Sequence, residues 1–329
     1  MLLVARALEE GVFGGPLARA AAQIWGSVSA RHVVRPLELP PHVRVVAVGG
    51  ATLGGSGKTP LAIACARELA RTGARVALVG HAYRARPGCP RVVSPGDPLA
   101  LVGDEALVAA AELEAAGVPV VVAPDRASAV AFAARSADVL VLDGVAQTRP
   151  RPATLALLAV DPEEPWGRAA ALPPCGDLRA PVEALLAAVD AVVPVNEADD
   201  PGPFPWDALR GARVGLVSAL ARPHRVLRSL ARRGIVPRVV VRARDHTPVA
   251  IRALRQHERS RSVDVWVATR KCSLHAPRPT LTRERLMVLP HAILLPPWLG
   301  AALARIGHAL TPADQGNNLK CHEGLRPHA

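Results

Sequence analysis

The sequence is poor in aromatic side chains, has no paired cysteines and contains no long apolar run. Aromatic residues make up only 3% of its 329 residues, so the stacking platforms that bind single-stranded nucleic acid are hard to build. The five cysteines form no C-x-x-C pair and are odd in number, which argues against a zinc ribbon or a disulfide framework and fits a reducing cytoplasm. No apolar run reaches the roughly 18 residues of a membrane-spanning helix. We therefore expect neither a nucleic-acid partner nor an integral span.

Positive charge is concentrated in the later part of the chain. The formal net charge is +12, and residues 210–329 hold 22 of the 40 basic side chains but 6 of the 28 acidic ones. This part carries +16, whereas the earlier part carries −4. Such a surface attracts phosphates on nucleic acid, anionic lipid or a phosphorylated substrate. Arginine-rich composition alone is the alternative explanation of the total, and it explains the asymmetry less well.

Apolar, β-branched runs alternate with alanine-rich helical segments, which is typical of a parallel sheet covered by helices on both faces. The first series of runs predicts strands at 43–48, 75–79, 118–123, 138–142, 155–160 and 188–195. Helices are predicted between them, for example at 60–71, 104–116 and 126–134. A second series of strands is predicted at 213–217, 236–242, 263–268 and 286–289, with a helix at 223–233.

These runs predict two α/β domains separated by a proline-dense passage. We expect a nucleotide-binding domain of the P-loop type over residues 31–205 and a smaller α/β domain over 206–310, followed by a polar tail at 311–329. Residues 1–30 have apolar side chains at helical spacing. This segment is either an interfacial membrane helix or a helix packed on the domain.

The stretch VVAVGGATLGGSGKTP, residues 45–60, passes from a predicted strand through glycines into a predicted helix. A phosphate-binding loop requires this order, because backbone N–H groups and the helix N-terminus then face one phosphate. Lys58 is expected to reach the terminal phosphates, and the Thr59 hydroxyl to bind Mg²⁺. Thr52 stands where the strict P-loop pattern has glycine. The full set of expected nucleotide-binding residues is Gly54, Gly55, Ser56, Gly57, Lys58 and Thr59.

Further motifs follow the loop in a distinctive order: VGDEALVAA, VPVVVAPDRASA, DVLVLDG, LPPCGDLRAP and RARDH. With them the chain resembles the tetraacyldisaccharide 4′-kinases, the lipid A kinases of Gram-negative bacteria, from about residue 44 to residue 246. The resemblance implies ATP and Mg²⁺ as cofactors and transfer of the γ-phosphate to the 4′-hydroxyl of a tetraacylated glucosamine disaccharide 1-phosphate. It also implies attachment to the anionic cytoplasmic face of the inner membrane, peripheral or monotopic.

The same resemblance assigns catalytic roles. Asp104 of GDEA and His246 of RARDH would form a dyad at the sugar hydroxyl, assisted by Lys58. An Asp–His pair suits this task, since the carboxylate accepts or orients the hydroxyl proton and the imidazole tunes it. Without the resemblance, Asp104 is read as a carboxylate that stabilises a helix N-terminus.

The family resemblance also implies which residues bind the metal and which contact the substrate. Asp143 ends a buried strand, as an acidic residue directed at Mg²⁺ should. The metal ligands expected are Thr59, Asp143 and Glu105, and the substrate contacts expected are Arg126, Gln147 and Arg179.

The sequence departs from the family pattern at several positions. Where the family has a second aspartate and a histidine after the strand, Gly144 and Thr148 stand here; Ala180 replaces a glutamate and His81 an arginine. Two interpretations follow: a divergent lipid A 4′-kinase, or a catalytically impaired nucleotide-binding relative that acts as a binding or regulatory protein. A GTPase is disfavoured, because Glu197 takes the place of lysine in a possible N-K-x-D element.

Overall fold

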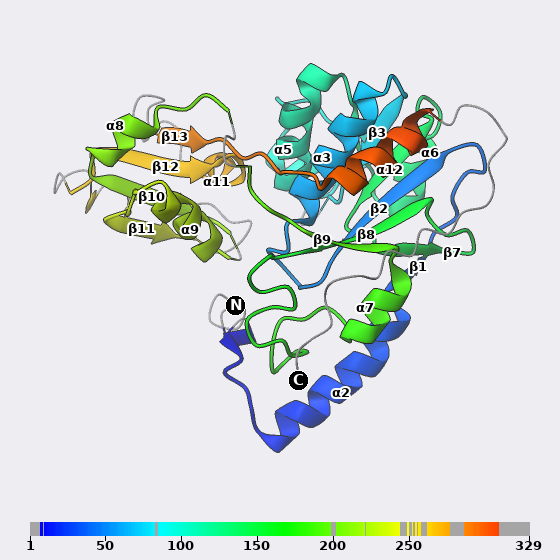
Figure 1. Ribbon diagram of the computed structural model, residues 1–329, viewed down its shortest axis with the longest axis horizontal. Coiled ribbons are helices and arrows are strands. Elements are labelled where there is room, and N and C mark those ends of the chain that lie inside the picture. Colours follow the sequence, from blue (N-terminus) through cyan, green and yellow to red (C-terminus); the bar gives the residue numbers. More distant parts are fainter. Residues whose placement is uncertain are drawn as a thin grey trace. The chain divides into compact units, whose positions relative to one another are not determined.

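The computed structural model describes residues 7–308, apart from 9, 83–84, 199–201, 221, 244–248, 250–251, 253, 255, 258–261 and 277–285. The chain divides into two compact units (Figure 1). The smaller unit is built from Glu197–Ile293, and the larger from the described residues before and after that stretch. Each unit has its own sheet and its own core.

The larger unit contains a seven-stranded sheet in the order β4-β5-β3-β6-β2-β8-β9. All neighbouring strands are parallel except β4 and β5, which are antiparallel. Strands β3 and β6 are buried along their whole length, as strands covered on both faces must be. The strand bounds are β2 Arg44–Gly50, β3 Val76–Val79, β4 Arg91–Val92, β5 Val120–Val122, β6 Val139–Asp143, β8 Leu155–Val160 and β9 Ala191–Pro194.

Helices cover both faces of this sheet. On one face, α3 (Lys58–Arg71) lies against β2, β3, β6 and β8, and α5 (Asp104–Leu113) packs beside α3. The other face is covered by α6 (Arg126–Ala133) and α7 (Val182–Ala188). Their apolar sides pack against strand residues such as Ala47 and Ala156, which are paired between β2 and β8 and therefore point to the same face of the sheet. The predicted P-loop type α/β fold is confirmed. Two short helices, α4 (Leu99–Val102) and the 3₁₀ turn η1 (Glu114–Ala116), flank α5.

The last described helix also belongs to the larger unit. Helix α12 (Pro297–His308) packs along α3, beside which it runs in Figure 1. At their contact Gly307 meets Thr72 so closely that a Cβ on Gly307 would lie 2.0 Å from the Thr72 hydroxyl oxygen. The Arg44 guanidinium donates a hydrogen bond to the carbonyl oxygen of Ile306. The helix that follows the phosphate loop is therefore supported by a segment more than 200 residues later in the chain.

An N-terminal helix precedes the sheet. Helix α2 (Pro16–Arg31) buries only Gly26, and its side chains Leu17 and Ile24 are 88% and 68% exposed. It leads into β1 (Val34–Pro36), which forms a separate two-stranded parallel sheet with β7 (Gln147–Arg149). Within the part of the chain that the structure describes, no helix has the length and apolar character needed to cross a bilayer.

The smaller unit is a four-stranded parallel sheet in the order β11-β10-β12-β13. Its core is apolar on both faces: α8 and α9 cover one, and α11 packs on the other. The close packing of this sheet is seen at Gly215, where a Cβ would lie 2.5 Å from the Trp266 ring. The bounds are α8 Trp206–Arg210, β10 Val214–Ser218, α9 His224–Arg232, β11 Val239–Arg242, β12 Val265–Thr269, α11 Arg270–Leu274 and β13 Leu286–Leu289.

Candidate functional site

The loop between β2 and α3 is held tightly by close contacts. A Cβ on Gly50 would lie 2.1 Å from the Ser56 hydroxyl oxygen. Gly57 has a φ of +85°, and a Cβ there would lie 2.8 Å from Val195 Cγ1. Position 57 therefore requires glycine, whereas a Cβ at position 50 would displace the Ser56 hydroxyl. Thr52 is buried, and its hydroxyl donates to the Gly54 carbonyl at 2.8 Å. A threonine thus fixes the loop where the strict pattern has glycine.

Two side chains at the start of α3 meet acidic partners. The Lys58 ammonium lies 3.5 Å from the Glu105 carboxylate. The Thr59 hydroxyl donates a hydrogen bond of 2.7 Å to Asp143, the last residue of β6. Parallel strands β2 and β6 end side by side, which brings the loop and this carboxylate together.

The Asp143 carboxylate is suited to a cation. It is 1% exposed, and its second oxygen Oδ1 has no hydrogen-bond partner within the described residues. Burial raises the pKa of Asp143, while the Lys58 charge and the Thr59 hydrogen bond act in the opposite direction. In the described ranges no three His, Cys, Asp or Glu side chains are grouped to hold a metal. A metal here would use Thr59, Asp143, phosphate oxygens and water, the ligand set that Mg²⁺ prefers.

Gly144, which follows Asp143, lies among three nitrogen-bearing side chains. A Cβ on Gly144 would lie 3.6 Å from Arg126 Nη2, 3.7 Å from Lys58 Cε and 4.0 Å from His81 Cδ2. Arg126 donates to the Val79 and Gly80 carbonyls at the end of β3, which holds its guanidinium in this position. Burial, and next the Arg126 charge, lower the pKa of His81 to about 4. The imidazole is therefore neutral at pH 7.

Arg179 supports the loop from the side opposite α3. Its guanidinium donates to the carbonyl oxygens of Gly50 (3.1 Å) and Thr52 (3.2 Å), and its backbone N–H donates to Ala51. Gln147 is also committed to the backbone, because its side-chain oxygen accepts from the N–H groups of Thr148 and Ala153. Only the Gln147 amide nitrogen could contact a substrate.

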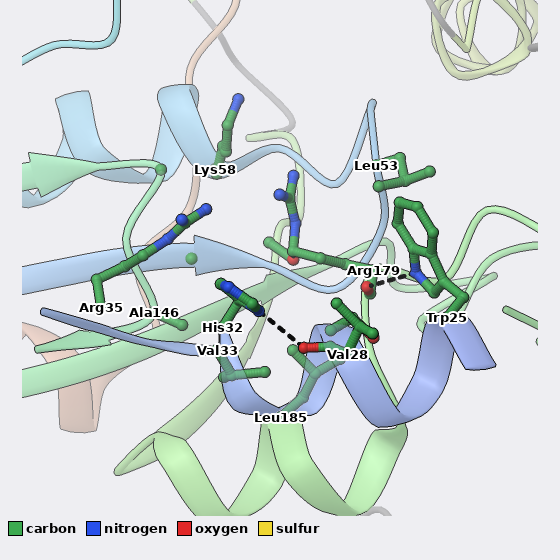
Figure 2. A pocket seen from close by; sticks show the side chains of 14 residues that line it. Trp25, Val28, His32, Val33, Arg35, Leu53, Lys58, Ala146, Arg179 and Leu185 are labelled. Atoms are coloured by element: carbon green, nitrogen blue, oxygen red, sulfur yellow. Dashed lines mark hydrogen bonds between the residues drawn. The ribbon is translucent and has the colours of Figure 1, made fainter. Parts of the chain in front are cut away.

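A cavity of about 430 Å³ adjoins the loop (Figure 2). One wall is apolar and comes from α2, the loop and α7, with Trp25, Val28, Leu53 and Leu185. The other carries nitrogen-bearing side chains, from His32, Arg35, Lys58 and Arg179. The Trp25 indole N–H donates to the Arg179 carbonyl at 3.3 Å, which ties the two walls together. Sequence reasoning missed Trp25, His32 and Arg35, because nothing in the sequence marks α2 and β1 as neighbours of the loop.

Only one member of the expected Asp104–His246 dyad lies within the described residues. Asp104 is buried in the first turn of α5, next to Glu105. His246 lies outside the described residues. The pairing of the two therefore stays a prediction.

Comparisons with known proteins agree on one family. The profile of the tetraacyldisaccharide-1-P 4′-kinase family matches residues 16–206. A tetraacyldisaccharide 4′-kinase of Methylorubrum extorquens is 39% identical over 63% of this chain and 62% of its own length. One of Anaeromyxobacter dehalogenans is 34% identical over 66% of this chain and 68% of its own length.

A solved structure extends the likeness in fold. LpxK from Aquifex aeolicus, crystallised with ATP, aligns over 88% of this chain and 98% of its own, with a TM-score of 0.61 and 20% identity. The similarity in fold therefore includes most of both units. Among the sequence relatives, however, the chain spans about three fifths of the Methylorubrum protein and about half of a 40% identical Methylobacterium protein.

The doubly covered parallel sheet and the GGSGKT loop at the end of β2 define a protein of the P-loop class. Within that class, the profile match and the identity to the Anaeromyxobacter relative decide the family. The chain belongs to the tetraacyldisaccharide 4′-kinase family.

Proposed function

We propose that this chain transfers the γ-phosphate of ATP to the 4′-hydroxyl of a tetraacylated glucosamine disaccharide 1-phosphate, the precursor of lipid A. The observation that carries the proposal is the convergence of Lys58, Thr59 and Asp143 at the phosphate loop, beside a cavity with one cationic and one apolar wall. Family membership supports the choice of donor and acceptor.

The loop side would hold the nucleotide. Backbone N–H groups from Gly54 to Lys58 would surround the β-phosphate, and Lys58 would turn from Glu105 to the terminal phosphates. Thr59 and Asp143 would hold Mg²⁺, with Glu105 close by. The metal would supply charge neutralisation between the phosphates during transfer.

The cavity side would hold the acceptor. Asp104 is proposed to accept the proton of the 4′-hydroxyl, with His246 as its partner. Arg126 and Arg179 would stabilise charge on the transferring phosphoryl group. The amide nitrogen of Gln147 would orient the sugar.

Exposed apolar side chains support attachment to a membrane surface. Leu17, Ile24 and Val28 lie on one face of α2 and are all exposed. Trp25 belongs to the same helix and lines the cavity. We propose that this face enters the interfacial layer of an anionic membrane, so that acyl chains reach the apolar wall without leaving the lipid.

A second candidate is a nucleotide-binding relative with impaired catalysis. The positions where the family pattern is lost have structural roles here. The Thr148 hydroxyl is buried and donates to the Arg151 carbonyl at 2.8 Å, and Ala180 is buried in the core beneath α7. Gly144 brings no carboxylate to Asp143.

Transfer of labelled γ-phosphate from ATP to the disaccharide acceptor in detergent micelles tests the two candidates. We would compare the unmodified protein with Lys58→Ala, Asp104→Ala and a matched control, Arg71→Ala. Arg71 is a cation of the same helix, but its side chain is 76% exposed at the far end. Product from the unmodified protein and the control, but not from the other two, supports the kinase.

Other outcomes would separate the candidates. ATP binding without product in any variant would favour the impaired relative. Absence of ATP binding, measured by calorimetry, would contradict both candidates. A Lys58→Ala variant as active as Arg71→Ala would show that the loop is not the catalytic site.

Membrane attachment has its own test with anionic lipid vesicles. Ile24→Glu places a charge on the apolar face of α2, whereas Gln23→Glu adds the same charge to a neighbouring exposed position on another face. We expect Ile24→Glu to release the protein from the vesicles and Gln23→Glu to leave it bound. Equal partitioning of the two variants would remove α2 from the proposal.

A further inference from the structure

Arg35 lines the cavity and lies outside the sequence motifs on which the family resemblance was based. It lies in β1, between Val34 and Pro36, and β1 pairs with β7 so that Arg35 stands opposite Thr148. Side chains alternate along a strand. Val34 packs against the core beneath α7, so Arg35 projects from the opposite side of the strand. The pairing with β7 thus fixes the direction of its side chain.

Arg35 and Arg179 approach the same space from different elements. Figure 2 shows the Arg35 side chain reaching across the cavity toward Arg179 and Lys58. Arg179 is anchored at one edge of its guanidinium by the Gly50 and Thr52 carbonyls. These two bonds use Nε and Nη2, so the third guanidinium nitrogen, Nη1, is available to a ligand.

The nearby acids, Glu105 and Asp143, make their direct contacts with Lys58 and Thr59 and not with the two arginines. In the part of the chain that the structure describes, neither Arg35 nor Arg179 is in an ion pair. Burial, and next the charge of Arg35, lower the pKa of Arg179. Burial also lowers the pKa of Arg126; the Asp143 charge opposes this shift, and the Arg35 charge adds to it. Like charges gathered at a cavity repel one another, and an anion bound between them would remove that repulsion.

We propose that Arg35 and Arg179 form a two-arginine clamp that binds a terminal phosphate group in the cavity beside Lys58. Guanidinium groups suit this ligand, because their planar N–H pairs match two phosphate oxygens at once. The clamp rests on the proposed kinase function and deepens it. This phosphate group is either the terminal phosphate of the nucleotide, which is part of an anhydride, or the phosphate monoester that the acceptor already carries.

Steady-state kinetics of Arg35→Ala and Arg35→Lys test the clamp. Arg149→Ala is the matched control, because Arg149 is an exposed arginine of the same two-stranded sheet and does not line the cavity. Losing a charge-assisted contact lowers kcat/KM by about tenfold or more. We expect that loss for Arg35→Ala and a smaller one for Arg35→Lys, which keeps the charge but not the planar fork.

Two acceptors identify the source of the phosphate. If Arg35 binds the acceptor's own phosphate, the loss appears with the disaccharide 1-phosphate and is absent with the same disaccharide lacking that phosphate. If it binds the terminal phosphate of the nucleotide, the loss is equal for both acceptors, and calorimetry shows weaker ATP binding with ADP binding unchanged. Kinetic constants and affinities of Arg35→Ala within twofold of the control would overturn the clamp.

A failure of the kinase proposal would be recognised separately. In that case the unmodified protein phosphorylates neither acceptor, and the clamp is judged by binding alone. Titration of ATP, ADP and micelles of the two disaccharides should still show weaker binding of one phosphate-bearing ligand by Arg35→Ala. Unchanged binding of all four would then contradict the clamp as well.

Discussion

The ends of strands β2 and β6 lie side by side in the larger unit, but they differ in how many of the functional residues expected from the family pattern they retain. Val48 pairs with Asp143, and the Gly144 N–H donates to the Val48 carbonyl at 2.9 Å. The end of β2 retains the GGSGKT loop, in which Gly57 has a positive φ and leaves no room for a Cβ. The end of β6 retains one carboxylate and then a glycine. We therefore expect mutations at the two strand ends to affect nucleotide binding and phosphoryl transfer to different degrees.

The largest expected effect comes from Asp143, whose side chain links the two ends by accepting the Thr59 hydrogen bond. Asp143→Asn removes the carboxylate that meets Thr59, so Mg²⁺-dependent phosphate transfer should fall about 100-fold or more. The control is Asp138→Asn just before the same strand, since Asp138 only pairs with the exposed Arg75. Transfer rates at saturating ATP and Mg²⁺ measure the difference. Equal rates for the two variants would show that β6 does not contribute to the site.

Gly50→Ala should damage the end of β2 selectively. Its Cβ would overlap the Ser56 hydroxyl, which we expect to cost about 1–3 kcal/mol of stability and to weaken ATP binding. Gly300→Ala in α12 is the control, because nothing lies within 4 Å of its Cβ, and alanine in a helix should add up to about 1 kcal/mol. Thermal unfolding and ATP calorimetry measure both variants. A Gly50→Ala protein as stable as the control would contradict the close contact in the loop.

Gly144→Asp tests whether restoring the second aspartate of the family pattern at the end of β6 increases activity. It would bring a second carboxylate near Lys58 and Arg126. The φ of +84° makes a side chain unfavourable by about 1–2 kcal/mol, so stability should fall while the transfer rate rises several-fold. Gly144→Asn has the same size and no charge and should lose stability without gaining activity. If Asp and Asn variants have equal rates, the missing carboxylate is not what limits turnover.

The smallest effect concerns His81, which lies near both strand ends. Its pKa falls from an ordinary 6.5 to about 4 in the folded protein, mainly through burial and then through Arg126. Between these values the unfolded chain binds more protons than the folded one, so this residue destabilises the fold as pH falls from about 6.5 to 4. His81→Gln should flatten that part of the stability curve in urea unfolding. Parallel curves for the two proteins would contradict the pKa shift.

The sequence predicted the sheet and its helices because each of these elements is a local pattern. Strands such as β6 are continuous apolar runs, and α3 begins directly after the glycines that mark the loop. It named Thr59 and Asp143 as ligands of one Mg²⁺ ion, and the structure places the two side chains 2.7 Å apart. The departures at Gly144, Thr148 and Ala180 were visible from motif comparison alone.

Other features depend on contacts between distant segments and have no local signal. Arg35 in VVRP resembles any surface arginine until β1 is placed beside β7. The Gln147 side-chain oxygen accepts hydrogen bonds from two backbone N–H groups, and no local sequence pattern predicts these bonds. No motif marks the return of the chain to the larger unit at α12.

That return makes the smaller unit an insertion within the larger one. The chain leaves after Asn196 and comes back at Leu294, and the Leu294 N–H donates to the Asn196 carbonyl at 3.1 Å. Because the two crossing points touch, a linker of very few residues could rejoin them after the gene segment for 197–293 is removed. The P-loop unit could then be produced as one continuous chain with α12 still packed on α3.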